Sequence, residues 1–381
     1  MEVNPVRELH SFTPLNSKHL TERAVCANGD IKPPAAFSNG VKCDLVLLSW
    51  NNLNILKECV ESIFRCARVP SRLVVVDNGS CEKGLKDYLL SLKSNDVIDV
   101  NIILNAKNEG FAAGMNKGMS LSEMPYVCIL NNDLIVTDGW LEEMIRVAEE
   151  NPVVGIINPS SNNFGLRFGK DATLEEFARG LKSESGRWVE MNACIGFCML
   201  VKREVIKKIG YFGEEYGYAY FEDTDFSRRA QAAGYKCAMA NGCYVYHAEG
   251  KSGKFLKSKD AQFRKSAEIF YGKWGKPLRV VCVARKNGKD LSARLIERVN
   301  SELAAHNRVW LFQEESADVS NLPRHLDLMI TKFSKKFFNL RAFWNIIKKK
   351  KRFDRLYIGN TWLRALLAPY CWIRKAEIRR L

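Results

Sequence analysis

Between residues 42 and 136 the sequence switches repeatedly between two patterns. Continuous apolar runs alternate with segments in which apolar residues recur at helical spacing. Continuous apolar runs such as CDLVLLSW (43–50) and SRLVVVD (71–77) end in polar turn residues and predict buried parallel strands. Between them, Leu56, Val60 and Ile63 recur at helical spacing. Similar patterns predict a helix over 83–93, a strand over 100–105, a helix over 108–121 and a strand over 126–133. Because strand–helix–strand units form right-handed crossovers, we predict an α/β fold with a mostly parallel central sheet.

The pattern restarts after Pro277 and divides the chain into three predicted regions. Segments 278–286, 291–306, 308–315 and 326–333 again alternate strand and helix, which predicts a small C-terminal α/β appendage. Residues 1–40 are polar, contain prolines and have no period, so they favour a flexible or loosely docked extension. We therefore expect an extension over 1–40, a main domain over 41–276 and a basic C-terminal α/β and helical region over 277–381.

Composition narrows the cellular setting. No apolar run approaches the roughly 18 residues that span a bilayer, and the first twenty residues lack a signal pattern. Both observations predict a cytoplasmic protein. The twelve cysteines include no CxxC pair and lie mostly in apolar segments, which predicts reduced thiols in the core.

The net charge of +15 is concentrated at the C-terminus. Residues 331–381 carry 15 basic and two acidic side chains, whereas the other 330 residues carry 43 and 41. In this segment the cations alternate with aromatic residues: Phe337, Phe338, Phe343, Trp344, Trp362 and Trp372. Such a segment can lie on an anionic membrane surface or bind nucleic acid. A solvated basic helical face is the alternative.

Polar residues recur at the predicted carboxyl ends of successive strands. They are Ser49, Asn51, Asp77, Asn105, Asn108 and the triplet Asn131, Asn132 and Asp133. Ligands of α/β sheets bind at these ends, so a shared site is expected, although each residue could separately end a strand in a turn. Gly110 and Gly114 would let a phosphate approach the backbone, or would let a helix pack closely on the sheet.

Two further segments contain candidate chemistry. Asp133 follows an apolar strand and His247 ends another, and a divalent cation would compensate a carboxylate in such a setting. An Asx turn and an ordinary packed histidine are the alternatives. Glu222, Asp223 and Asp225 stand together before FSRRAQAA, where Asp223 or Thr224 could cap a helix that Gly234 ends. Carboxylates this close also raise one another's pKa, which is typical of active sites.

In order and spacing, six motifs resemble the family 2 glycosyltransferases with the GT-A fold. They are VVVDNGS, NEGFAAGMNKG, LNNDLIV, GFCMLVKREVIKKIGYF, YFEDTDFSRRAQAAGY and YVYHAEGKS. The series covers residues 42–254 and is most similar to the rhamnosyltransferase-like branch, which builds bacterial surface polysaccharides.

The resemblance implies a role for each matching residue. Asp223 would be the base that deprotonates the acceptor hydroxyl, with Glu222 beside it. Asp133 and His247 would bind Mg²⁺ or Mn²⁺, although Asn131 and Asn132 stand where the family has acids, which puts strong metal binding in doubt. The nucleotide-sugar would lie against Ser49, Asn51, Asp77, Asn108, Gly110, Gly114, Asn116 and Asn132.

The implied function is an inverting, metal-dependent hexosyl- or rhamnosyltransferase. Its partners would be a nucleoside-diphosphate sugar and a glycan or lipid-linked acceptor, and the C-terminal segment would bring it to the cytoplasmic face of a membrane. A nucleotidyltransferase is one alternative, but the chain lacks an N-terminal glycine-rich loop with a basic activating residue. A nucleic-acid-binding protein would explain the basic C-terminus and leave the other motifs unexplained, so nucleic acid is not the expected partner.

Overall fold

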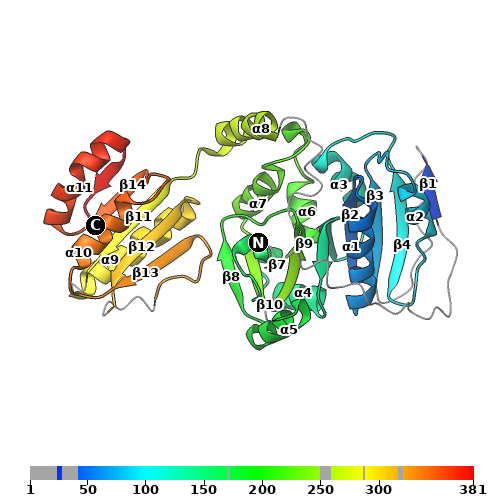
Figure 1. Cartoon of the computed structure of the whole chain (residues 1–381), viewed down its shortest axis with the longest axis horizontal. Coiled ribbons are helices and arrows are strands. Elements are labelled where there is room, and N and C mark those ends of the chain that lie inside the picture. Colours follow the sequence, from blue (N-terminus) through cyan, green and yellow to red (C-terminus); the bar gives the residue numbers. More distant parts are fainter. Residues whose placement is uncertain (1–23, 28–41, 170–171, 249–258, 286–287, 316–320) are drawn as a thin grey trace.

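Two separate sheets organise the molecule (Figure 1). The computed structural model describes residues 24–27, 42–169, 172–248, 259–285, 288–315 and 321–381. The predicted N-terminal extension lies outside the described residues, except for strand β1 (Ala24–Ala27), which pairs with β4. The end of the last motif of the resemblance, after Ala248, also lies outside them.

The larger sheet has ten strands in the order β1-β4-β3-β2-β5-β9-β7-β10-β6, with β8 paired to β10. Strands β1 to β5 are parallel to one another, whereas β9 is antiparallel to both of its neighbours. The expected α/β fold with a mostly parallel central sheet is confirmed. The remaining strand bounds are β2 (Cys43–Ser49), β3 (Ser71–Asp77), β4 (Ile98–Leu104), β5 (Tyr126–Asn131), β6 (Leu134–Val136), β7 (Val154–Ser160), β8 (Trp188–Met191), β9 (Cys198–Lys202) and β10 (Lys236–His247).

Helices cover both faces of the larger sheet. One face packs against α1 (Leu53–Cys66), α2 (Leu85–Ser91) and α4 (Trp140–Glu150), and the other against α3 (Phe111–Ser120), α6 (Arg203–Ile209) and α7 (Glu222–Ala232). The apolar stripe predicted for α1 is buried, with Leu56, Val60 and Ile63 almost fully covered. Each such side chain contributes roughly 1.5–3 kcal/mol by its burial, which holds the helices in place around the strand ends. Helix α5 (Leu174–Leu181) packs on β10, and α8 (Lys259–Trp274) leads to the smaller sheet (Figure 1).

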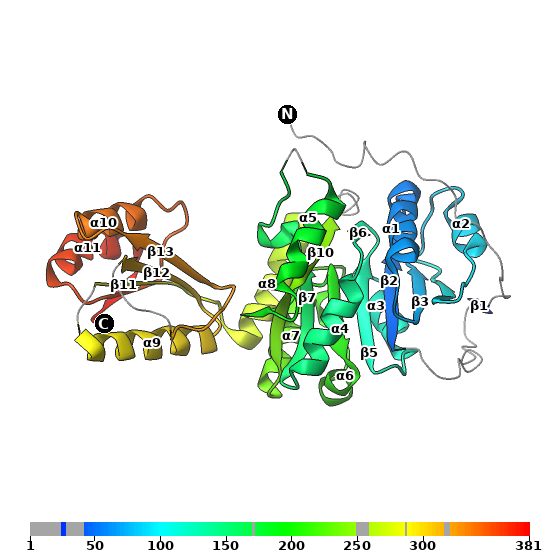
Figure 2. The same cartoon turned by 90° about the horizontal axis from the view of Figure 1, so that it is seen from below.

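The smaller sheet is entirely parallel and has the strand order β13-β12-β11-β14-β15. Helix α9 (Gly288–Ala304) covers one face, and α10 (Phe338–Ile347) and α11 (Thr361–Arg374) cover the other (Figure 2). The strands are β11 (Arg279–Ala284), β12 (Arg308–Glu314), β13 (Leu328–Phe333), β14 (Arg355–Ile358) and β15 (Glu377–Arg379).

Residues after 333 complete this sheet instead of following it. Strand β14 inserts beside β11, and Phe338 and Phe353 are buried in the core between the sheet and helices α10 and α11. The four segments that the sequence pattern identified are therefore only the first part of this unit. The cause is that β14 has only four residues and lies between two basic segments, so its strand signal is weak.

The two sheets are joined through β8. Glu190 donates its N–H to Arg324 O (3.3 Å) and accepts from Leu326 N (2.7 Å), so the loop before β13 pairs with β8. Asn192 N also donates to the Asp327 carboxylate over 3.1 Å. The smaller sheet is thus fixed to the same half of the larger sheet that carries α7.

Two predictions from composition concern cysteines and membrane spans. All eleven cysteines among the described residues are free thiols, and ten of them are buried, as predicted. Within the same residues, we find no helix with the length and apolar character needed to cross a membrane.

Candidate active site

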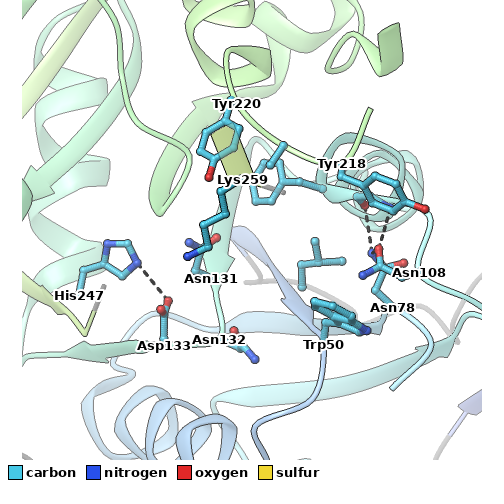
Figure 3. Close-up of a pocket in the computed structure, with 14 residues that line it drawn as sticks. Trp50, Asn78, Asn108, Asn131, Asn132, Asp133, Tyr218, Tyr220, His247 and Lys259 are labelled. Atoms are coloured by element: carbon cyan, nitrogen blue, oxygen red, sulfur yellow. Dashed lines mark hydrogen bonds and ion pairs between the residues drawn. The ribbon is translucent and has the colours of Figure 1, made fainter. Parts of the chain in front are cut away.

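A pocket of about 300 Å³ opens at the carboxyl ends of β2, β3 and β5 (Figure 3). This volume is at the lower end of the range typical of small-ligand sites. Of the predicted residues, the structure brings six to this pocket: Asn108, Gly110, Asn131, Asn132, Asp133 and His247. Further lining residues were not predicted from the sequence: Leu48, Trp50, Asn78, Phe111, Tyr218, Ala219, Tyr220 and Lys259.

Asn78 holds one end of the pocket together. Its side-chain N–H groups donate to Asn108 Oδ1 and to Gly110 O, each over 3.0 Å. Its Oδ1 accepts from Asn105 Nδ2 (3.0 Å) and from Glu109 N (3.1 Å). One amide therefore fixes the loop after β4 against the end of β3, where Trp50 and Tyr218 also lie (Figure 3).

Gly110 is required at its position by two features of the backbone. Its φ of +91° is strained for residues with a side chain, and a Cβ would lie 2.7 Å from Gly217 O. Gly114 has a packing reason instead, because a Cβ there would lie 2.5 Å from Leu48 Cδ1. The glycine loop is thus tightly packed, and its predicted contact with a phosphate stays a prediction.

Five predicted nucleotide-binding residues do not line the pocket: Ser49, Asn51, Asp77, Gly114 and Asn116. Asp77 is fully buried and accepts from Ser80 N over 3.3 Å, and burial raises the pKa of its carboxyl. Asn51 accepts from Cys81 N over 3.0 Å, and Asn116 Nδ2 donates to Phe212 O over 3.0 Å. In this conformation these side chains stabilise loops around the pocket, and their binding roles stay predictions.

Asp133 and His247 form the pair that the sequence proposed as metal ligands. Pairing of β6 with β10 brings His247 Nε2 within 3.1 Å of Asp133 Oδ1, and both side chains are largely buried. His247 Nδ1 lies 3.0 Å from Asn163 Oδ1. Because that oxygen only accepts, Nδ1 is the ring nitrogen that donates a proton to Asn163, and Nε2 is the one that faces Asp133. The ring stacks on Phe197, which fixes its plane.

This pair fits a divalent cation. Asp133 Oδ1 is buried and has no hydrogen bond to another described residue, and it lies 3.1 Å from His247 Nε2. Two acceptors in contact repel each other unless a proton or a metal ion lies between them. In addition, a histidine whose other ring nitrogen donates to an amide oxygen is typical of metal sites. The described part of the chain contains no group of three or more His, Cys, Asp or Glu that could hold an ion. Further ligands from the described residues would therefore be amide or backbone oxygens, alongside water or substrate oxygens.

A second pocket, of about 480 Å³, adjoins the first and is lined by two of the three clustered acids. Phe111, Asn131, Ala219, Tyr220 and His247 line both pockets, so the two form one continuous depression. Glu222, Asp223 and Thr224 line the second pocket together with Phe263. A ligand in the first pocket and a ligand in the second would therefore be neighbours.

The three clustered carboxylates have different environments. Asp223 is half-buried and accepts from Gly196 N (2.9 Å) and Thr224 N (2.6 Å), and burial raises the pKa of its carboxyl. Glu222 is buried with Oε2 unpaired among the described residues, and burial followed by the charge of Asp223 raises its pKa to about 8. Glu222 is therefore protonated at neutral pH, and Asp223 is the carboxylate that can accept a proton.

Asp225 stabilises the packing of two helices. It accepts from Lys273 Nζ (2.7 Å), Trp274 Nε1 (2.8 Å) and Arg229 Nε (2.7 Å). Although burial raises the pKa of Asp225, these donors lower it below its ordinary value. The carboxylate thus ties α7 to α8.

The start of α7 differs from the prediction. The helix begins at Glu222, and the residue before it, Phe221, has a φ of +73° and provides no side-chain cap. The prediction that Asp223 or Thr224 caps the helix is therefore wrong, whereas Gly234 ends it with a φ of +95°, as predicted. Tyr220 also has a positive φ, and two such residues cost roughly 1–3 kcal/mol each. Stacking of Phe221 on Phe270, with centroids 5.0 Å apart, helps to hold this conformation.

Comparison with known proteins gives a family match for the first part of the larger sheet. Residues 44–210 match the family model of Glycosyl transferase family 2. The matched segment is slightly less than half of the chain. It includes the strands that end at the first pocket and stops before α7 and His247.

Individual relatives are distant. The chain is 24% identical over 248 residues to an uncharacterized protein, y4gI, of Sinorhizobium fredii, which covers 60% of this chain and 27% of the relative. It is 24% identical over 179 residues to glycosyltransferase GlyG of Streptococcus pneumoniae, covering 44% of this chain and 58% of the relative. It therefore spans less than two thirds of these relatives. A mannosyltransferase from Pyrobaculum calidifontis, solved with GDP-mannose and Mn²⁺, aligns over 57% of this chain and 59% of its own, with 17% identity and a TM-score of 0.43.

Proposed function

We propose that the chain is a GT-A-type inverting glycosyltransferase that moves a hexose or rhamnose from a nucleoside-diphosphate sugar to a hydroxyl group. The observation that carries the proposal is the continuity of the two pockets. The first holds the Asp133–His247 pair, and the second holds the carboxylate of Asp223. The family match over residues 44–210 supports the same reaction class.

The chemistry follows from this arrangement. The donor would occupy the first pocket with its sugar toward the second, where the acceptor lies. The acceptor oxygen forms a bond to the anomeric carbon while the bond from that carbon to the diphosphate breaks, and the electron pair stays with the diphosphate. Asp223 takes the proton of the acceptor hydroxyl, because its raised pKa makes it a better base than an exposed carboxylate. Attack opposite the leaving group inverts the anomeric configuration.

Asp133 and His247 would hold Mg²⁺ or Mn²⁺. When bound, such an ion acts as a Lewis acid that stabilises the negative charge of the departing diphosphate. Asn163 orients the ring of His247, and Phe197 packs along it, so the protein keeps this ligand ready.

The experiment that tests the proposal is incubation of the protein with a panel of nucleotide-sugars, with and without Mn²⁺. The products are followed as released nucleoside diphosphate and as glycosylated acceptor. A nucleotidyltransferase would instead release pyrophosphate from a nucleoside triphosphate and a sugar phosphate. Retention of nucleic acid without any sugar transfer would favour the nucleic-acid-binding alternative.

We also propose that the enzyme works peripherally on the cytoplasmic face of a membrane, on a glycan or lipid-linked acceptor in surface polysaccharide synthesis. The support comes from the helices of the smaller sheet. Helix α11 exposes Trp362 (56%), Trp372 (84%) and Ile373 (69%), and α10 exposes Trp344 (48%). Both helices pack on the same face of their sheet and contact each other (Figure 2).

The charge near these aromatic residues matches an anionic lipid surface. Lys348, Lys349, Lys350 and Lys351 follow α10 and are exposed. Each basic residue near such a surface contributes about 1 kcal/mol, and tryptophan is favoured at the lipid–water boundary. Phe338 takes no part in this surface, because it is buried in the core.

Vesicle sedimentation tests the membrane proposal. The full chain should bind vesicles that contain phosphatidylglycerol and should bind pure phosphatidylcholine vesicles far less. The double variant Trp362→Ala and Trp372→Ala should reduce binding roughly tenfold or more, while Val153→Ala, an exposed apolar control on the larger sheet, should not. Equal binding by the double variant and the wild type would exclude this surface. Deletion of 333–381 is no test, because it removes β14 and part of the core.

A further inference from the structure

Among the described residues that line the proposed donor pocket, Asp133 is the only carboxylate and Lys259 is the only lysine or arginine. Lys259 is half-buried, and no ion pair joins it to another described residue. An anionic ligand in the pocket would replace part of the hydration that its ammonium loses there.

The position of Lys259 suits one part of a nucleotide-sugar. Lys259 lines the pocket together with Tyr220 and Asn131 (Figure 3). Asp133 and His247 lie on one side of it, and Trp50 and Asn78 lie on the other. In a donor molecule the diphosphate is the link between nucleotide and sugar, and in the view of Figure 3 Lys259 lies between the two groups of residues.

The charge of the pocket favours the same ligand. Residues 131 and 132 are asparagines, so Asp133 is the one acid of the triplet and the pocket side chains sum to zero. A diphosphate ester carries about two negative charges, and it gains a third when its bond to the sugar breaks. A lysine that donates to the diphosphate oxygens gains most where that charge develops.

We propose that the ammonium of Lys259 binds the diphosphate of the donor and stabilises it as the leaving group. The inference rests on the proposed glycosyl transfer. It assigns to α8 a direct contact with substrate, and it explains how a site with two asparagines in its acidic triplet can stabilise a diphosphate. Lys259 would thereby add to the charge stabilisation that an ion at Asp133 and His247 provides.

The test compares nucleoside diphosphates with the corresponding nucleosides. Binding of UDP, GDP and dTDP, and of uridine, guanosine and thymidine, is measured by calorimetry on the full chain, in EDTA and again in Mn²⁺. The variants are Lys259→Ala, Lys259→Arg and the control Lys207→Ala. Lys207 is an exposed lysine on α6 that does not line the pocket.

For the nucleoside diphosphate that the wild type prefers, Lys259→Ala should weaken binding roughly tenfold in EDTA, the loss of one charge-assisted hydrogen bond. Nucleoside binding should stay unchanged, which also shows that the variant is folded. Lys259→Arg should keep most of the affinity, and Lys207→Ala should match the wild type.

Two results would overturn the inference, and only the second would also overturn the proposed function. If Lys259→Ala weakens nucleoside and nucleoside diphosphate equally, or neither, Lys259 does not contact the diphosphate and the glycosyltransferase proposal stands. If the wild type binds no nucleoside diphosphate at millimolar concentration in Mn²⁺, both proposals fail together.

Discussion

Replacing Glu222 with glutamine should stabilise the folded protein at neutral pH. Glu222 is 6% exposed, and its pKa is raised to about 8 from an ordinary value of 4.5. Between these two values the unfolded chain releases the proton while the folded chain keeps it. The free energy of unfolding therefore falls as pH rises through this window, by about 1.4 kcal/mol per pH unit. At pH 7 the cost of keeping Glu222 protonated is about 3 kcal/mol.

Glutamine has nearly the same size as glutamate and does not titrate, so Glu222→Gln removes this cost. Urea unfolding followed by circular dichroism at pH 5, 6, 7 and 8 measures the effect. The variant and the wild type should differ by less than about 1 kcal/mol at pH 5, and the gap should widen to about 3 kcal/mol at pH 7 and level off above pH 8. Glu123→Gln, at an exposed glutamate of the same sheet unit, should show no such trend.

Parallel stability profiles for Glu222→Gln and the wild type would refute the reasoning. They would mean that Glu222 ionises as an ordinary solvated carboxyl. In that case Glu222 could compete with Asp223 as the base, and the assignment of the proton to Asp223 would lose its physical support.

Three further predictions concern the carboxylates and histidine of the site. Asp223→Asn should lower kcat by roughly 10²- to 10⁴-fold while leaving nucleotide-sugar affinity within about twofold, and near-normal turnover would exclude Asp223 as the base. Asp133→Ala should raise the Mn²⁺ concentration needed for half-maximal activity sharply, and His247→Ala less so; unchanged metal titrations in both would place the ion elsewhere. Asp225→Asn should destabilise the fold by roughly 3 kcal/mol at pH 7. The difference from the wild type should shrink in acid, because the wild-type carboxylate is then protonated, and thermal unfolding at pH 7 and pH 3 would measure it.

Much of the larger sheet could be predicted from the sequence because its signals are local. Strands β2 and β3 are buried on both faces and therefore appear as unbroken apolar runs. The reversed direction of β9 could not be predicted in this way. Its segment, CMLVK, is apolar like a parallel strand, and its direction depends on long-range pairing with β5 and β7.

The site residues differ in the same way, because some of them have a local signal in the sequence and others do not. Asp133 and His247 were identifiable because each is a polar residue at the end of an apolar run, and the structure brings them together. Asn78 has an equally good position after β3, but the preceding Asp77 carries the more conspicuous charge and proves to be buried. Lys259 has no local signal, because it reaches the pocket from a helix that follows the rest of the site in the chain.

The pairing of residues 324–326 with β8 also affects where the chain can be shortened. Strand β8 lies beside β10 and would otherwise present the N–H and C=O groups of Glu190 to solvent. Unpaired groups on an edge strand are templates for intermolecular pairing and aggregation. A truncation near residue 276 would keep both pockets and remove this cover, so the isolated larger sheet should self-associate through β8. We therefore expect the smaller sheet to protect the larger one from self-association, whether or not it binds a membrane.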